Sequence, residues 1–139
     1  MHHHRILQVR WDDLDAFGHV NNASYLTLVQ EARSDFLWFS RQRAGMAPML
    51  ADMVVARAEV DFIEPIYEGG IEIDVSISVA RIGTASFDLI YELTSGGVLN
   101  ARAKTVQVAV SMDSKRSRPI TQEERDFLSL YINEGAEEK

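Results

Sequence analysis

The stretch RWDDLDAFGHVNNASYLTL, residues 10–28, decides how this chain folds and where its chemistry is expected. Asp12, Asp13 and Asp15 stand close together, ahead of a glycine, a histidine and two asparagines. Acidic residues stabilise the positive N-terminal end of a helix, and Asn is a favoured N-cap. A single cap needs only one acceptor, so this surplus of polar groups, beside a glycine that lets a ligand approach the backbone, predicts more than helix capping.

The residues that follow predict one long amphipathic helix. It begins with Asn21 or Asn22 as its N-cap and ends before Gly45 and Pro48. This corresponds to about five or six turns. Apolar residues recur at helical spacing at Tyr25, Leu28, Val29, Ala32, Phe36 and Phe39.

Period-two alternation predicts strands for most of the remaining chain. A short strand over residues 6–11 precedes the acidic stretch, and four sequential strands follow the long helix, at about 54–63, 71–80, 85–93 and 98–111. Glycine turns, including SGG at 95–97, join these four sequential strands as an antiparallel meander. A short helix is expected at 122–132. The predicted class is α+β, an antiparallel sheet of about five strands wrapped around one long helix.

The length of 139 residues predicts a single domain over 1–139, with 133–139 as a fraying tail. Residues 1–4 are a possible tag remnant or disordered, so His2, His3 and His4 are left out of any metal argument. An open sheet edge predicts a homodimer or a homotetramer.

Composition excludes several classes of function. The chain has no cysteine, which excludes cysteine catalysis, and its formal charge of −7 disfavours general nucleic-acid binding. No apolar run is long enough for a membrane span, so a cytoplasmic protein is expected. The richest basic segment, with Lys115, Arg116 and Arg118, is either a solvated charge run or a site for phosphate groups.

The acidic stretch admits three interpretations. The first is helix capping alone. The second is a metal pair, Asp13 and Asp15, with His19 as a third ligand, although this spacing is unspecific. The third is an acyl-transfer site, in which backbone amides near Gly18, His19 and Val20 polarise a carbonyl and Asp13 or Asp15 attacks the acyl carbon or deprotonates water.

The segment WDDLDAFGHVNNASYL closely resembles the D-x-D-x-x-G-H-V-N-N-x-x-Y signature of the hotdog-fold acyl-CoA thioesterases, the family that includes 4-hydroxybenzoyl-CoA thioesterase. The segments VDFIEPIYEGGIEIDVSISVARIGTASF and VSMDSKRSRPITQEER also look like parts of that family, so the resemblance covers about residues 8–128. It implies a long helix held in an antiparallel sheet, in agreement with the periodicity.

The resemblance also implies roles for individual residues. The second aspartate of the pair, Asp15, would be the catalytic carboxylate, with the backbone of Gly18, His19 and Val20 facing the thioester carbonyl. The site would lie at a dimer interface that the partner's strands complete. No metal or cofactor is expected, since coenzyme A is part of the substrate. Residues expected near the substrate are Asn22, Tyr25, Arg81, Gly83, Thr84 and Ser86, although Asn22 also fits a cap, Tyr25 a core position, and the other four a surface hairpin.

Two other functions fit the same residues. A hotdog acyl-CoA hydratase or dehydratase would use His19 and Asp15 as a base and acid pair. A non-catalytic acyl or coenzyme A binding module would keep the fold without turnover. Free thiol release distinguishes the hydrolase from both alternatives, and fold alone does not supply the acyl preference.

Overall fold

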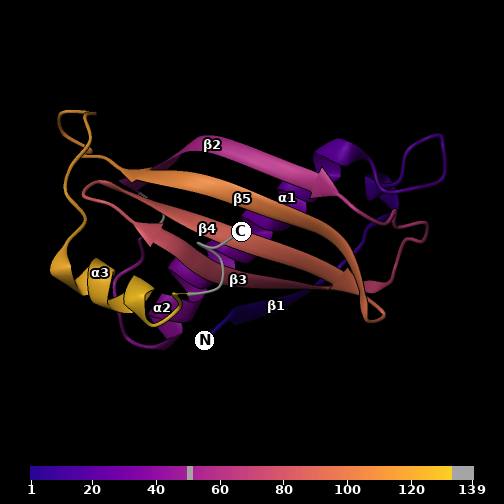
Figure 1. Cartoon of the computed structure of the whole chain (residues 1–139), viewed down its shortest axis with the longest axis horizontal. Coiled ribbons are helices and arrows are strands. Elements are labelled where there is room, and N and C mark those ends of the chain that lie inside the picture. The colour runs from indigo at the N-terminus through magenta and orange to yellow at the C-terminus, as the bar shows by residue number, and fades with distance from the viewer. Residues whose placement is uncertain (50–51, 133–139) are drawn as a thin grey trace.

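A five-stranded antiparallel sheet wraps around one helical run in the computed structural model, which describes residues 1–49 and 52–132 (Figure 1). The order across the sheet is β1-β3-β4-β5-β2, so β1 and β2 are its edges. The predicted α+β class is therefore confirmed. The strands are β1 (His3–Gln8), β2 (Met53–Phe62), β3 (Glu72–Ile82), β4 (Ser86–Ser95) and β5 (Val98–Ala109).

The predicted meander of four sequential strands is correct for β3, β4 and β5 and wrong for β2. That strand pairs with β5, from Met53 opposite Ala109 to Phe62 opposite Ala101. The connection over residues 63–71 carries the chain across the end of the sheet to β3, where Ile66 and Ile71 form backbone hydrogen bonds with Val20 and Val9. Alternating apolar and polar residues predict that a segment is a strand. They do not predict which strand it pairs with, because that depends on the path of the connecting segment.

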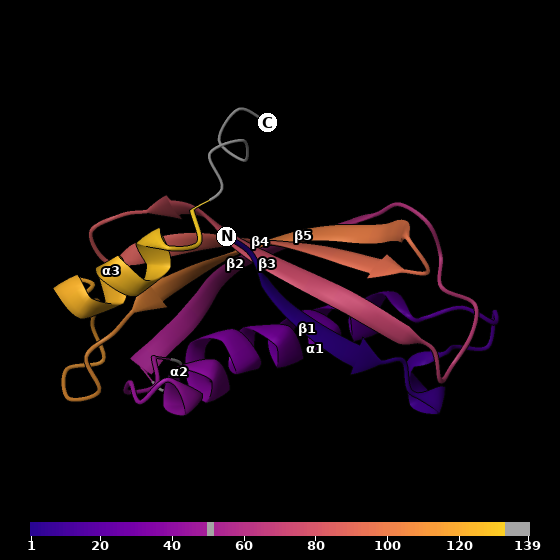
Figure 2. The ribbon, with the colours of Figure 1, turned by 90° about the horizontal axis from the view of Figure 1, so that it is seen from below.

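The long helix predicted from residue 22 is confirmed as a continuous helical run. It consists of α1 (Asn22–Ser34), a π-helical segment η2 (Asp35–Phe39) and α2 (Ser40–Arg43). Asn21 is the N-cap, because its side-chain oxygen accepts a hydrogen bond from the Ala23 amide at 2.8 Å. Figure 2 shows the run lying along one face of the sheet.

The π-helical segment changes which residues face the core. Phe36 and Leu37 are fully buried, whereas Phe39, predicted on the apolar stripe, is 52% exposed. A π-turn takes more residues per turn than an α-turn, so residues after its start rotate away from the face that α-helical spacing predicts.

The core lies between the helical run and the inner face of β3, β4 and β5. The predicted inward residues of β3 and β4 are confirmed as completely buried, although the outward Ser78 and Asp88 are buried as well. The inward residues are Ile73, Val75, Ile77, Val79, Phe87, Leu89, Tyr91 and Leu93. On β2 the prediction of a buried face is wrong: Val54 and Phe62 are each about half exposed and Val60 is only partly buried. An edge strand lacks a neighbour on one side, so its apolar residues remain at the surface of a single chain.

The two ends of the chain differ from prediction in their bounds. The first strand, predicted over 6–11, starts at His3 and ends at Gln8, and Trp11–Asp13 form a 3₁₀ turn, η1. His3 and His4, treated above as a possible disordered remnant, lie in β1 opposite Ile77 and Ser76.

The helix predicted over 122–132 is α3 (Gln122–Ser129). The predicted fraying tail lies outside the described residues. Within 1–49 and 52–132, no helix is long and apolar enough to cross a membrane.

Candidate active site

The turn that holds Asp15 is built by backbone hydrogen bonds immediately before α1. The Asp15 amide donates to the His19 carbonyl at 3.0 Å, and the Gly18 amide donates to the Asp15 carbonyl at 3.1 Å. Gly18 has φ of +82°, a conformation that disfavours residues with a side chain. The chain therefore reverses at Gly18 and places Asp15 beside His19, in the turn that leads into α1.

The structure gives the two aspartates of the D-x-D pair different environments. Asp13 is 1% exposed and accepts hydrogen bonds at 2.8 Å from both the backbone amide and the guanidinium of Arg10. Burial acts to raise the pKa of Asp13, but the hydrogen bonds from Arg10 outweigh it and hold that pKa below its ordinary value. The Asp13 carboxylate is therefore occupied as a structural anchor of the turn.

Asp15 retains an accessible carboxylate. Its side chain is 22% exposed, and Oδ1 accepts a hydrogen bond from the Phe17 amide at 2.9 Å. Oδ2 lies 3.9 Å from Nδ1 of His19 and has no hydrogen-bond partner among the described residues. Of the two aspartates, Asp15 is thus the one whose carboxylate can reach a bound molecule.

His19 is half-exposed and lies beside Asp15. Its Nδ1 is 3.2 Å from the Val20 carbonyl, which favours the tautomer that donates a proton there. Asp13, held by Arg10, does not join Asp15 and His19, so the three-ligand metal arrangement considered as an alternative does not form. Within the described part of the chain, no three His, Asp or Glu side chains gather as metal ligands.

The three backbone amides predicted to face the substrate carbonyl differ in availability. Gly18 donates to Asp15, as described, and Val20 donates to the Ile66 carbonyl at 2.8 Å, so neither is a free donor. The amides of His19 and of Asn22, the first residue of α1, donate to no carbonyl among the described residues. The unpaired donors at this helix end are therefore at His19 and Asn22, where the helix dipole also favours negative charge.

Tyr25 packs in the core and Asn22 lies at the surface of the turn. Tyr25 is 3% exposed, and its ring meets Phe62 edge-on with centroids 5.2 Å apart. Burial raises the pKa of the Tyr25 hydroxyl, and a hydrogen bond to the Ile66 backbone only partly offsets this. This environment favours the core interpretation of Tyr25 over a substrate contact.

The structure does not bring Arg81, Gly83, Thr84 and Ser86 to Asp15 within one chain. They belong to the β3–β4 turn, at the end of the sheet beside α3, whereas the Asp15 turn lies at the opposite end (Figure 1). Arg81 binds Ser86 at 2.8 Å and Asp88 at 2.9 Å, and Arg125 donates to the Gly83 carbonyl at 3.0 Å. Only a second chain could place such a turn near this Asp15.

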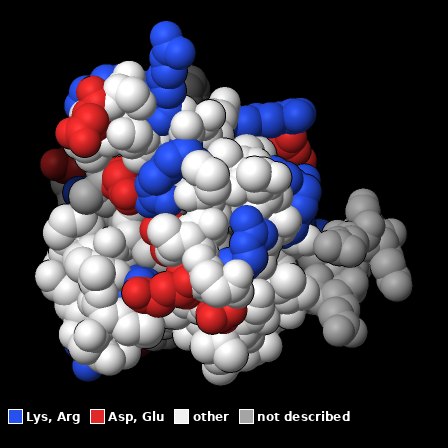
Figure 3. All heavy atoms as spheres, turned by 90° about the vertical axis from the view of Figure 1, so that its left-hand side faces the viewer, with Lys and Arg blue, Asp and Glu red and all other residues white. Residues whose placement is uncertain are grey.

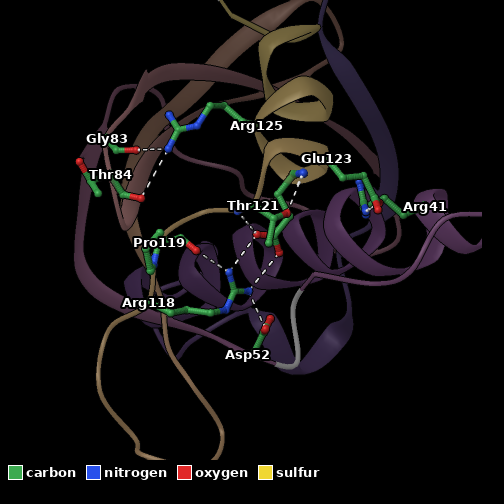
Figure 4. A network of polar contacts seen from close by, with 10 residues as sticks. Arg41, Asp52, Gly83, Thr84, Arg118, Pro119, Thr121, Glu123 and Arg125 are labelled. Carbon is green, nitrogen blue, oxygen red and sulfur yellow. Dashed lines mark hydrogen bonds and ion pairs between the residues drawn. The ribbon is translucent and has the colours of Figure 1, made fainter.

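The basic segment after β5 is partly committed to the fold (Figure 4). The Arg118 guanidinium binds both carboxylate oxygens of Glu124, at 3.0 and 3.1 Å, and also pairs with Asp52. Arg118 therefore cannot serve phosphate groups without losing these partners, whereas Lys115 and Arg116 are exposed. Figure 3 shows cationic side chains interspersed with carboxylates at this end of the molecule.

Sequence reasoning missed two large aromatic residues beside the turn. Trp11 and Phe17 are 82% and 85% exposed, and the Phe17 ring stacks near His19 with centroids 6.5 Å apart. It also missed the connection at Ile66, which holds Val20 in place. Aromatic residues flanking a polar stretch are a signal in the sequence, but only the turn geometry shows that these side chains point away from the core.

Comparison with known proteins identifies relatives over most of the chain. A family model described as the thioesterase-like superfamily matches residues 9–128. A 1,4-dihydroxy-2-naphthoyl-CoA hydrolase of Nostoc punctiforme is 30% identical over 136 residues, covering 94% of this chain and 90% of that protein.

Solved structures agree on the fold. A predicted thioesterase from Bacillus stearothermophilus superimposes with a TM-score of 0.82 at 24% identity, over 96% of this chain and 98% of that one. A thioesterase from Thermus thermophilus, complexed with coenzyme A and Zn, gives a TM-score of 0.75 at 29% identity, over 98% and 95% of the two chains. The architecture is thus the hotdog fold that the sequence resemblance implied.

Proposed function

The chain belongs to the thioesterase-like superfamily, and on that premise we propose that it hydrolyses acyl-CoA thioesters at the Asp15 turn. The observation that carries the proposal is an accessible Asp15 carboxylate, 3.9 Å from His19, in a turn that leads into α1 and contains the unpaired amides of His19 and Asn22. A carboxylate and an oxyanion-stabilising helix end are the two elements that acyl transfer requires.

The reaction begins when the thioester carbonyl binds at the start of α1. The His19 and Asn22 amides donate to its oxygen and stabilise the negative charge of the tetrahedral intermediate. Asp15 either attacks the acyl carbon, giving an anhydride that water then hydrolyses, or takes a proton from an attacking water. Both routes expel coenzyme A as the thiolate and yield the free acid, and neither requires a metal or a further cofactor.

A homodimer through the free edge of β2 would complete the site. Val54, Val55, Phe62 and Ile63 leave apolar surface exposed there, between 44% and 50% each. A two-fold axis near Ala58 would pair β2 antiparallel with its copy, as in an isologous interface. This pairing sets opposite ends of the two chains side by side, so the β3–β4 turn of a second copy would approach the Asp15 turn of the first.

Thiol release from acyl-CoA thioesters by wild type and Asp15→Asn tests the proposed chemistry. The panel comprises acetyl, hexanoyl, palmitoyl, benzoyl and phenylacetyl coenzyme A. Asn keeps the shape of the side chain but neither attacks nor accepts a proton well, so kcat should fall by about 10²–10⁴-fold. Asp12→Asn, an exposed neighbour, is the matched control and should keep wild-type rates. An Asp15→Asn variant with most of its activity would exclude Asp15 as the catalytic carboxylate.

One observation favours a second candidate reaction. Asp15 and His19 lie 3.9 Å apart and could act as the acid and base of a hydratase on the same thioesters. A hydratase would change the absorbance of an enoyl-CoA without releasing thiol. Following both signals in one assay therefore separates the two reactions.

A further inference from the structure

A second polar site lies far from the Asp15 turn, between the later turns of α1 and the start of β2. A cavity of about 180 Å³ is lined there by Gln30, Arg33 and Ser34 of α1, by Met53, Val54 and Val55 of β2, and by Gln107 of β5. One wall is apolar and the other presents hydrogen-bonding groups. The cavity opens at the free edge of β2, where Val54 and Val55 are exposed.

Arg33 is buried at this cavity without a counter-charge. Arg33 is only 7% exposed, and no carboxylate within residues 1–49 and 52–132 pairs with its guanidinium. Nη1 donates to the Tyr91 hydroxyl at 3.3 Å, whereas Nε has no hydrogen-bond partner in the described structure. A buried guanidinium is stable only when paired, so this arrangement calls for an acceptor with negative charge.

The surroundings of Arg33 extend the polar end of the cavity. The Tyr91 hydroxyl lies 2.6 Å from the Thr105 hydroxyl, which in turn lies 2.9 Å from the Gln107 amide group. Tyr91, Thr105 and Gln107 are each at most 1% exposed. These groups hold the guanidinium beside the cavity that Arg33 lines, and an Arg side chain suits a carboxylate because it pairs with one in a planar, bidentate geometry.

In the proposed dimer, the Arg33 cavity of one chain would lie near the Asp15 turn of the other chain. Arg33 lies about 16 Å along the helix from Asn22, too far to act on the same Asp15 turn directly. Antiparallel pairing of β2 with its copy would instead bring the start of this β2 beside the end of the other β2. There Phe62 contacts Tyr25 in the first turns of α1, close to the Asp15 turn.

We propose that the cavity at Arg33 binds the far end of the acyl group whose thioester lies at the Asp15 turn of the partner, and selects acyl chains that end in a carboxylate. The inference rests on the proposed function and on the β2 dimer. The apolar wall of Met53, Val54 and Val55 contacts the methylene chain, and Arg33 with Gln107 binds the terminal carboxylate. The substrate class is therefore a dicarboxylic acid esterified to coenzyme A at one end.

The test compares matched pairs of thioesters, glutaryl with pentanoyl, adipoyl with hexanoyl and suberoyl with octanoyl coenzyme A. Thiol release gives kcat/KM for wild type, Arg33→Met and the control Arg5→Met, which removes an exposed cation from β1 at the opposite sheet edge. Titration calorimetry gives Kd for each in the Asp15→Asn background, where the thioester is not consumed. In the best pair, wild type and Arg5→Met should favour the carboxylate-bearing chain by about tenfold or more. Arg33→Met should abolish that preference, because it removes the cation that binds the terminal carboxylate.

Met fills the volume of the Arg33 stem without a charge, so this variant is expected to fold. Should it not fold, Gln107→Leu removes a second donor to the carboxylate and is expected to reduce the same preference. Thiol release without any preference in wild type, or a preference that survives Arg33→Met, would overturn the carboxylate site and leave the hydrolase standing. Arg33-dependent binding of the carboxylate-bearing thioesters without thiol release would support the site and refute the hydrolase. Neither binding nor release would refute both.

Discussion

At the scale of single residues, the two aspartates Asp13 and Asp15 in the polar stretch before α1 have different roles. Asp13 is buried with Arg10 and holds the turn, whereas Asp15 keeps its carboxylate at the surface of the site. They are two positions apart in the chain, yet Asp13 faces the interior and Asp15 faces the site. Two residues of the same type can therefore differ in reactivity, because burial and hydrogen-bond partners determine the properties of a carboxylate.

The pairing of Asp13 predicts a pH-dependent stability difference. Because the folded-state pKa of Asp13 lies below that of the unfolded carboxylate, about 4, its contribution is complete above that pH and declines as pH falls through the folded-state pKa. Asp13→Asn should therefore lower the free energy of unfolding by about 1–2 kcal/mol at neutral pH, and by less in acid. Urea denaturation at both pH values measures this, and an equal deficit at both would contradict the assigned ion pair.

The conformation of Gly18 predicts a ranking of substitutions. Its φ of +82° disfavours a side chain, although a Cβ there would meet no atom within 4 Å. Gly18→Ala should cost about 1–2 kcal/mol through backbone strain alone, and Gly18→Asn less, because Asn tolerates this conformation. Thermal unfolding of the two variants measures the order. If Ala were as stable as Asn, the backbone would have relaxed out of this conformation.

At the scale of elements, ion pairs hold α3 and its preceding loop against the rest of the fold. Thr121 and Glu124 form a capping box at the start of α3, and Glu124 also binds Arg118. Burial acts to raise the pKa of Glu124, but its hydrogen bonds from Arg118 and Thr121 hold it below its ordinary value. At the other end of the network, the buried Arg41 binds Glu123 at 2.7 Å (Figure 4). Its guanidinium also lies over the Phe127 ring, 4.6 Å from the centroid.

Loss of Arg118 should destabilise this end of the molecule. Arg118→Leu leaves the carboxylates of Asp52 and Glu124 without their shared partner, and the free energy of unfolding should fall by about 1–3 kcal/mol. Arg116→Leu, at an exposed position of the same loop, is the control and should change it by less than about 0.5 kcal/mol. Chemical denaturation compares the two, and equal stabilities would show that the Arg118 network is energetically neutral.

At the scale of the whole molecule, one chain leaves the proposed machinery divided between its two ends. The Asp15 turn lies at one end, and the β3–β4 turn and the Arg33 cavity lie toward the other. The apolar surface of β2 runs between them and lies at an open sheet edge. An antiparallel dimer would cover that surface. It would also bring the separated groups together, because it places one end of each chain beside the opposite end of its copy.

The dimer predicts that a charge in the middle of β2 removes activity without touching a catalytic group. In an isologous interface Ala58→Glu sets two like charges close together, so sedimentation should show a monomer and thiol release should fall by about tenfold or more. The control Arg5→Glu, on the other sheet edge, should preserve both the assembly and the rate. A fully active Ala58→Glu monomer would exclude a site shared between copies.

By itself, the sequence determined the elements of this protein and the location of its chemistry. Periodicity revealed the long helix and the strands, because helices and strands bury one face with a fixed repeat. The stretch from Asp12 to Asn22 marked the candidate site, because so many polar residues in a short segment exceed what helix capping needs. The resemblance of that stretch to a thioesterase signature pointed to the family that the comparisons show.

Only the tertiary structure decided which groups meet. It placed β2 beside β5, turned Phe39 outward through the π-helical segment, and separated Arg81 to Ser86 from Asp15. It also engaged the amides of Gly18 and Val20 and left Arg33 without a counter-charge. These outcomes depend on contacts between residues far apart in the chain, and local pattern carries no information about such contacts because the same repeat is compatible with several pairings.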